Sequence, residues 1–165
     1  MFDGLMSSMG FRSRKKTLAS PLAGHVLPLQ EVQDDTFSTC ILGEGVAVEP
    51  TGNRVVAPAD ARVVAIFPTG HAVALRTVDG FDVLIHIGID TVKLKGRHFK
   101  VRAAQGQDVK RGDVLIEFER EAIRAEGYDI IVPVLLRNVL EYSVIRGCEG
   151  DLVEELDPLL AVRVR

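Results

Sequence analysis

The stretch Asp82-Val83-Leu84-Ile85-His86-Ile87-Gly88-Ile89-Asp90-Thr91-Val92 places one imidazole in a run that is otherwise largely aliphatic. A short apolar run rich in β-branched residues is typical of a β-strand. An imidazole titrates near neutral pH, so its position here suggests a chemical role. Taken alone, however, a histidine in such a run is more often a core residue bonded to backbone.

A second imidazole, that of His71, lies fifteen residues earlier, at the start of the strand-like stretch 71–76. The dipeptide Asp79-Gly80 between the two stretches is a typical hairpin turn. Two antiparallel neighbours joined in this way can bring His71 and His86 together. On a rigid sheet, one of the two imidazoles can carry a group while the other steadies it.

The rest of the chain has the same short-strand pattern from about residue 17 onward. Strands are expected at 26–29, 46–48, 55–57, 62–67, 72–75, 83–87, 114–118, 130–136 and 162–164, with Gly, Pro, Asn and Asp between them. One helix is expected over 119–125, ending at Gly127. The predicted fold is all-β, an antiparallel barrel or sandwich with one or two short helices.

A faint internal repeat aligns residues 20–29 with residues 57–66. Each copy has a proline turn, a small or acidic bend and then an apolar strand. A duplicated β-motif produces this pattern, although turn and strand chemistry alone also produces such matches.

Composition narrows the functional classes. The chain has 165 residues, 47% hydrophobic residues, a net charge of -3 and no tryptophan. One domain with a full core is expected, and the charge argues against nucleic-acid binding. Cys40 and Cys148 are expected to be reduced, buried thiols in the cytoplasm. No apolar run reaches the roughly 20 residues of a membrane span, and no signal peptide is recognisable.

Residues 1–16 differ from the predicted domain, 17–165. Apolar side chains at positions 2, 5, 6 and 9 follow helical spacing, and a basic cluster follows at 12–16. Such a segment can lie on an anionic membrane surface, which would place the protein peripherally at the inner face of the membrane. A flexible, solvated tail is the simpler interpretation and is favoured over membrane contact.

Several phrases resemble one family in order along nearly the whole chain, from about Pro21 to the C-terminus. They are Pro50-Thr51-Gly52-Asn53-Arg54-Val55-Val56-Ala57-Pro58, Thr69-Gly70-His71-Ala72, the stretch 86–96, Phe99-Lys100, Gly106-Gln107-Asp108-Val109-Lys110 and the stretch 112–118. The chain resembles the glucose-type IIA phosphocarriers of the bacterial sugar phosphotransferase system. The resemblance implies an antiparallel β-barrel or sandwich built from a duplicated motif.

The resemblance also implies phosphoryl transfer as the activity, with no cofactor required. The phosphoryl group would come from the phosphohistidine of HPr and pass to a cysteine of a sugar-transporter IIB domain. In the unphosphorylated state, the same face would bind regulatory target proteins.

Carried over by position, the resemblance assigns His86 as the phosphorylated residue and His71 as the neighbour that contacts the phosphoryl group. Thr69 would orient His71, and the backbone carbonyl of Gly88 would orient His86. Asp90 keeps the acidic residue of the family. The chain departs from the usual pattern at Gly70, where asparagine is common, and at Ile87, where an aromatic residue is common.

Neutral imidazole suits this chemistry because it is both a nucleophile and a leaving group. One ring nitrogen attacks, and a hydrogen bond at the other nitrogen determines the tautomer. The hydroxyl of Thr69 can accept from His71, and a carbonyl at Gly88 can approach closely because glycine lacks a Cβ. Outward-facing members of the set Val83, Leu84, Ile85, Ile87 and Ile89 are expected to form an apolar rim for docking.

Three other functions compete with this one. A zinc hydrolase would use the two histidines and Asp90, but the chain has no His-x-His or His-Glu-x-x-His motif. In a weaker form, His71 and His86 would hold Zn²⁺ with a carboxylate from a partner. A purely regulatory binding module would use the same face. A lipoyl or biotinyl carrier needs a modifiable lysine, and Lys93 and Lys95 lie in no such phrase.

The remaining polar candidates are expected to be structural. His25 and His98 match no family position and are interpreted as surface residues. The stretch 119–126 is interpreted as a solvated helix rather than a catalytic acid pair.

Overall fold

The computed structural model describes residues 15–165, whose strands form three antiparallel sheets. The strands are β1 (Lys15–Ala19), β2 (Gly24–Pro28), β3 (Glu44–Pro50), β4 (Arg54–Val56), β5 (Ala61–Ile66), β6 (Ala72–Thr77), β7 (Asp82–His86), β8 (Phe99–Val101), β9 (Asp108–Val109), β10 (Val114–Phe118), β11 (Val132–Leu136), β12 (Tyr142–Gly147), β13 (Leu152–Val153) and β14 (Pro158–Val164). The helices are the 3-10 turns η1 (Leu29–Glu31) and η2 (Thr91–Leu94) and the α-helices α2 (Asp35–Ser38) and α3 (Arg120–Ala125).

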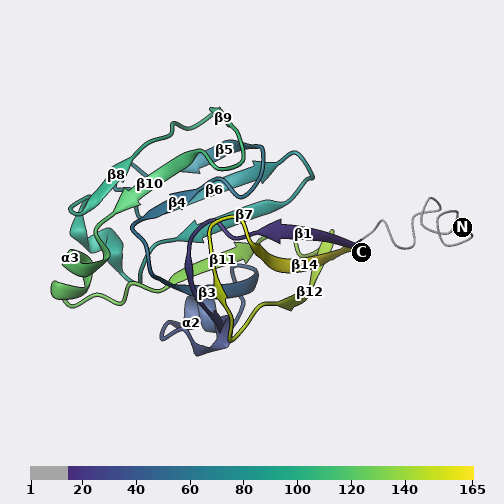
Figure 1. Cartoon of the computed structure of the whole chain (residues 1–165), viewed down its shortest axis with the longest axis horizontal. Helices are drawn as coiled ribbons and strands as arrows, with labels where there is room; N and C mark the ends of the chain where they lie inside the picture. The colour runs from purple at the N-terminus through teal and green to yellow at the C-terminus, as the bar shows by residue number, and fades with distance from the viewer. Residues whose placement is uncertain (1–14) are drawn as a thin grey trace, which may run out of the picture.

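The largest sheet has the order β13-β2-β3-β11-β7-β6-β5-β9, and it is accompanied by the sheets β4-β10-β8 and β1-β14-β12. Figure 1 shows α3 at one end of the body, β1 and β14 side by side at the other, and α2 against the lower edge. The all-β prediction is confirmed, as is the helix near residue 120.

Strict alternation along the central strands separates two apolar clusters. Val73, Leu75, Val83 and Ile85 are at most 1% exposed and lie in the main core. The residues between them face the other side of the sheet, as the period of two requires. On that other side a smaller cluster forms, in which η1 and α2 cover part of the sheet through Leu29, Val32 and Phe37.

The two copies of the faint repeat, residues 20–29 and 57–66, contain strands β2 and β5, which occupy equivalent positions in the large sheet. Strand β2 follows the first proline turn and β5 follows the second, and each lies one strand from an end of the sheet. Each also pairs with the next strand along the chain, β3 or β6, and with a two-residue strand at the edge. The sheet order therefore supports a duplicated motif.

All nine expected strands are present, with boundaries that differ by a few residues. The pattern missed β1, β8, β9, β12 and β13, as well as η1, α2 and η2. Strands β8, β9 and β13 have only two or three residues and show no measurable alternation, and helices of one turn show no period. Strands β1 and β12 have five and six residues, and their pairing with β14 defines them.

The expected boundary between tail and domain, at residue 17, falls inside strand β1. Strand β1 begins at Lys15, and Lys15 and Lys16 pair with Arg163 and Val162 of β14. The remainder of the expected tail, residues 1–14, lies outside the described residues. Within residues 15–165, no helix has the length and apolar character of a membrane span.

Candidate functional site

The β6–β7 hairpin brings the two predicted histidines together. Its turn is closed by Gly80, whose N–H donates to the carbonyl of Thr77 at 2.9 Å and whose φ of 92° suits glycine. At the other end of the hairpin, Ala72 pairs with His86 across the strands. The N–H of Ile87 donates to the carbonyl of His71 at 2.6 Å, so backbone ties the two histidine segments directly.

His86 is the last residue of β7, and its ring is oriented by the chain that follows. Nδ1 lies 2.7 Å from the carbonyl oxygen of Gly88. A carbonyl oxygen only accepts, so Nδ1 carries the proton. In the neutral ring, Nε2 is then left with its lone pair, and it has no hydrogen bond to any of the described residues. The predicted role of Gly88 as the carbonyl that orients His86 thus has the expected geometry.

Glycine is required at position 88 for two reasons. Its φ is 78°, in the left-handed region, and a Cβ there would lie 2.5 Å from Thr91 Cγ2 and 2.9 Å from the carbonyl oxygen of Asp129. The bend is held on both sides, because the N–H of Gly88 donates to Ile131 and that of Ile89 donates to Asp129, both at 2.9 Å. The carbonyl that orients His86 is therefore held in place by the segment that directly precedes β11.

His71 lies just before β6, and its Nδ1 is 2.7 Å from the hydroxyl of Thr69. A tight turn supplies this hydroxyl, with the N–H of Gly70 donating to the carbonyl of Phe67 at 2.8 Å. Gly70 has a φ of 74°, and a Cβ there would lie 2.7 Å from Phe99 Cβ. Replacement of the family's usual asparagine by glycine is therefore compatible with a left-handed residue in a crowded turn.

Four rings follow one another across the site. The ring centroids of His71 and His86 are 5.3 Å apart, with an interplanar angle of 74°. Phe37 from α2 lies 5.0 Å from His86, and Phe67 lies 5.0 Å from His71. The aromatic rings flank the imidazole pair and restrict how far either ring can move.

The environment keeps both imidazoles neutral. Burial, and then the neighbouring His86, lowers the pKa of His71 to about 4. Burial also lowers the pKa of His86, although the Gly88 carbonyl and the carboxylates of Asp34 and Asp90 oppose this effect. At neutral pH the site therefore presents uncharged imidazole, which is the nucleophilic form.

The expected apolar rim is largely wrong. Val83, Ile85 and Ile87 are at most 1% exposed, and Ile89 is buried as well, because three of them point into the main core and Ile89 packs against the segment of η1 and α2. Only Leu84 of that set is partly exposed. Exposed apolar side chains near the site come instead from flanking segments, with Phe67 46% exposed and Val92 50% exposed.

Phe37 and Phe67 are the site residues that the sequence reasoning missed. Phe37 lies in the segment that resembles the family least, and its contact with His86 joins positions 49 residues apart. Phe67 lies two residues before Thr69, at the end of the expected strand 62–67. The nearness of an aromatic residue to the Thr69-Gly70-His71 phrase was the one available signal.

The other candidates are not members of the ring cluster. Asp90 has a φ of 60° and directly precedes η2, and its carboxylate is near enough to influence the pKa of His86. His25 is exposed on β2, as expected. His98 is not a plain surface residue, because it is half-buried and its Nε2 contacts the carboxylate of Glu126. Cys40 and Cys148 are free thiols and only partly buried, each packed against the edge of an apolar cluster.

Comparison with known proteins identifies the family. Residues 16–142 match the family model described as the phosphoenolpyruvate-dependent sugar phosphotransferase system, EIIA 1. The chain belongs to this EIIA family. The glucose-specific EIIA component of Haemophilus influenzae is 36% identical over 163 residues, which are 99% of this chain and 98% of that protein.

Other EIIA relatives are parts of larger proteins. The glucose-specific EIIBCA component of Corynebacterium glutamicum is 51% identical over 133 residues, which are 81% of this chain and 20% of that protein. This chain thus spans about a fifth of the length of such fused relatives. The solved glucose permease IIA of Mycoplasma capricolum superposes with a TM-score of 0.84 at 30% identity, over 92% of this chain and 97% of that one. The EIIA β-sandwich fold is therefore shared.

Proposed function

We propose that this chain is a phosphocarrier whose Nε2 atom of His86 takes a phosphoryl group from the phosphohistidine of HPr and passes it to the cysteine of a sugar-transporter IIB domain. The observation that carries the proposal is the hydrogen bond from Nδ1 of His86 to the Gly88 carbonyl, 2.7 Å long. It leaves the other ring nitrogen unprotonated and ready to attack phosphorus. Family membership and the fused EIIBCA relatives support the class of reaction and the IIB partner.

The transfer balances in two displacements. In the first, a bond forms between Nε2 of His86 and phosphorus while the nitrogen–phosphorus bond of phospho-HPr breaks and the electron pair returns to the HPr imidazole. In the second, a IIB thiolate forms a sulfur–phosphorus bond while the His86–phosphorus bond breaks. No proton needs to leave His86 in either step, because Nδ1 keeps its own.

In this proposal His71 stabilises the charge on the transferring group. With a pKa of about 4, His71 is neutral at pH 7 and carries one ring proton. Nε2 of His71 can donate to a phosphoryl oxygen only if Nδ1 accepts, so the Thr69 hydroxyl donates to Nδ1 across their 2.7 Å contact. This direction is the reverse of the one expected from sequence. A donor positioned in advance is how proteins stabilise phosphoryl transfer.

A transfer assay tests the proposal. Wild type is expected to take the phosphoryl group from purified phospho-HPr, and His86→Gln is expected to take none. His71→Gln should still accept the group but pass it to a IIB domain about 100-fold more slowly, because a charge-stabilising donor is lost. Labelling of His86→Gln at the wild-type level would refute the site assignment. His25→Gln, at an exposed histidine, is the matched control.

We also propose that this transfer needs no resident metal. Among residues 15–165, no three His, Cys, Asp or Glu side chains are grouped so as to hold an ion. The family assignment favours phosphoryl transfer over the zinc hydrolase. A zinc ion held by His71, His86 and a carboxylate from a partner remains a separate hypothesis. In the assay, a chelator added after phospho-HPr has been purified should leave the transfer rate unchanged.

The same face suits reversible binding of regulatory partners in the cytoplasm. Phe67 is 46% exposed beside His71, so an apolar partner surface can cover the ring pair. A phosphoryl group would place about two negative charges at that contact. Binding of a regulatory protein should therefore be lost when His86 is phosphorylated.

A further inference from the structure

A row of charged side chains crosses the large sheet at the turn end of the β6–β7 hairpin. The row follows strand pairing, in which Asp108 lies opposite Arg62, Arg62 opposite Arg76, and Arg76 opposite Asp82. Arg137 continues it, since its N–H donates to the carbonyl of Asp82 at 2.7 Å. The Arg62–Arg76 rung places two cations directly across a strand pair, an arrangement that ordinarily costs stability.

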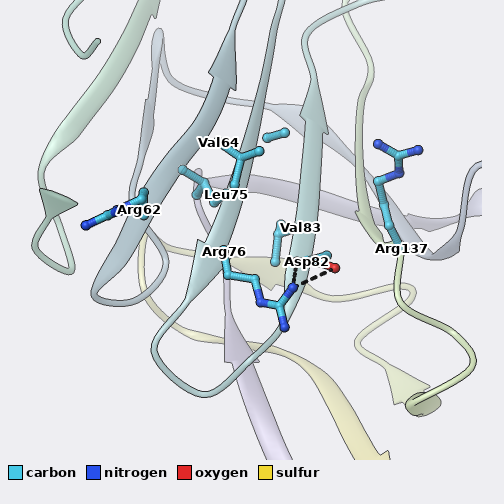
Figure 2. Close-up of a pocket in the computed structure, with 8 residues that line it drawn as sticks. Arg62, Val64, Leu75, Arg76, Asp82, Val83 and Arg137 are labelled. Carbon is cyan, nitrogen blue, oxygen red and sulfur yellow. Dashed lines mark hydrogen bonds and ion pairs between the residues drawn. The ribbon is translucent and has the colours of Figure 1, made fainter. Parts of the chain in front are cut away.

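The two arginines are drawn apart by carboxylates on opposite sides. Arg62 pairs with Asp108 at 3.0 Å, and Arg76 pairs with Asp82 at 3.1 Å. Between them lies an open groove of about 720 Å³, which we call the arginine groove, lined by Arg62, Val64, Ala74, Leu75, Arg76, Asp82, Val83 and Arg137. Figure 2 shows Arg62 and Arg76 diverging around Val64 and Leu75, with Arg137 on the far side of Asp82.

The arginine groove lies on the same side of the sheet as the phosphorylation site. Asp82, Leu84 and His86 alternate with the core residues of β7, so all three face away from the core. Asp82 lies four residues from His86, roughly 13 Å at about 3.3 Å per residue. An interface of about 800 Å² that extends from His86 along β7 toward the hairpin turn is large enough to include the arginine groove.

The sheet face that carries His86 is acidic on one side of His86 and richer in arginine on the other. Carboxylates of Glu31, Asp34 and Asp35 line a polar hollow beside α2, and Asp34 is near enough to influence the pKa of His86. On the other side, the row of charged side chains at the hairpin turn contains three arginines and two aspartates. This asymmetry can set the orientation of a docked protein.

Resting on the proposed function, we infer that the arginine groove docks an acidic segment of the IIB domain, with one apolar side chain on Val64 and Ala74 and a carboxylate between Arg62 and Arg76. A carboxylate there relieves the repulsion between the two like charges. Val64 is 51% exposed and provides the apolar contact. The IIB domain is chosen because relatives of this chain hold EIIB and EIIA in one polypeptide.

The test measures two rates in one set of variants: acceptance of the phosphoryl group from phospho-HPr and its passage to a IIB domain. The IIB domain used is one that accepts the phosphoryl group from the wild-type chain. The double reversal Arg62→Glu/Arg76→Glu should slow transfer to IIB about tenfold or more while acceptance from phospho-HPr stays within twofold. Unchanged acceptance shows that the fold and His86 are intact. Arg62→Lys/Arg76→Lys should transfer nearly as fast as wild type, as should Arg163→Glu, a control at an exposed arginine on β14.

The possible outcomes distinguish failure of the arginine groove proposal from failure of the proposed function. Equal transfer by wild type and the double reversal overturns the arginine groove proposal alone. Equal losses in both transfers show that the reversal disturbs the site or the HPr contact, and they also overturn it. If the wild-type chain passes the phosphoryl group to no IIB domain, the proposed function is wrong. The proposal that the arginine groove docks a IIB segment then fails with it.

Discussion

Both imidazoles make their hydrogen bond to the rest of the chain through Nδ1, but one partner is a carbonyl and the other is a hydroxyl. His86 contacts a carbonyl, which fixes the direction of the hydrogen bond, whereas His71 contacts a hydroxyl, which can donate or accept. The first arrangement suits an atom that must attack in every cycle. The second suits a residue whose protonation changes when a negative phosphoryl group arrives beside it.

The Thr69 hydroxyl can be removed with little change in shape. Thr69→Val should leave acceptance from phospho-HPr close to wild type and slow the passage to IIB about tenfold, because His71 loses the partner that determines its tautomer. Thr69→Ser keeps a hydroxyl and should restore most of the rate. A Thr69→Val protein that transfers at the wild-type rate would remove Thr69 from the mechanism.

Buried neutral His71 should also make stability depend on pH. Its pKa is about 4 in the folded chain against an ordinary value of 6.5, so between these values the unfolded chain binds a proton that the folded chain does not. The free energy of unfolding therefore falls as pH decreases from 6.5 to 4. From pH 7 to pH 4.5, wild type should lose about 2 kcal/mol more than His71→Gln in denaturant titrations. Equal losses would contradict the burial of a neutral imidazole.

At the scale of elements, the hairpin β6–β7 and the bend after it form the site. The sequence predicted this part well because the strands are long enough to alternate and the Asp79-Gly80 turn has a recognisable chemistry. It failed at Val83, Ile85 and Ile87, which were candidates for a rim and are core residues. Alternation shows which residues share a face, but it does not show which face another layer covers.

The segment with η1 and α2 could not be predicted for a related reason. Asp34 caps α2 by accepting from the N–H of Thr36 at 2.9 Å, and the helix lasts only four residues. Such a short helix has no period to detect, and packing of Phe37 against the sheet and His86 stabilises it. The aromatic flank of the site is thus a product of tertiary structure.

The bend at Gly88 can be tested with a matched pair of glycines. Gly88→Ala should lower the free energy of unfolding by about 2 to 4 kcal/mol, since it combines a left-handed φ with a Cβ 2.5 Å from Thr91 Cγ2. Gly106→Ala also has a positive φ, 85°, but its Cβ meets nothing within 4 Å, so only about 1 to 2 kcal/mol should be lost. Equal losses at the two positions would show that crowding at residue 88 is unimportant.

At the scale of the whole molecule, the large sheet separates the main core from the face that carries the candidate functional site. The main core occupies one side, and the other side carries the imidazole pair, the η1–α2 segment and the arginine groove. The family resemblance, which runs along nearly the whole chain, predicted the fold, and the structure confirms it. The roles that the resemblance assigns to His86, His71, Thr69 and Gly88 stay predictions, although the structure brings these residues together. The arginine groove could not be predicted, because its charge row joins β9, β5, β6, β7 and the end of β11 through pairings that the sequence does not reveal.

The role of the N-terminal segment is also a prediction about the whole molecule. Deleting residues 1–14 keeps β1 complete, whereas deleting 1–16 would remove its first two residues. The deletion should leave acceptance from phospho-HPr unchanged and weaken transfer to a membrane-embedded transporter several-fold, because an apolar stripe beside basic residues favours an anionic bilayer. Equal transfer with and without the segment would show that it is only a tail.

The position of phosphorus on the ring tests the central claim most directly. The chain is labelled with nitrogen-15 histidine, phosphorylated by phospho-HPr and examined by NMR for coupling between phosphorus and ring nitrogen. The account predicts coupling to Nε2 of His86, because Nδ1 is occupied by the Gly88 carbonyl at 2.7 Å. Coupling to Nδ1 of His86, or to either nitrogen of His71, would contradict it.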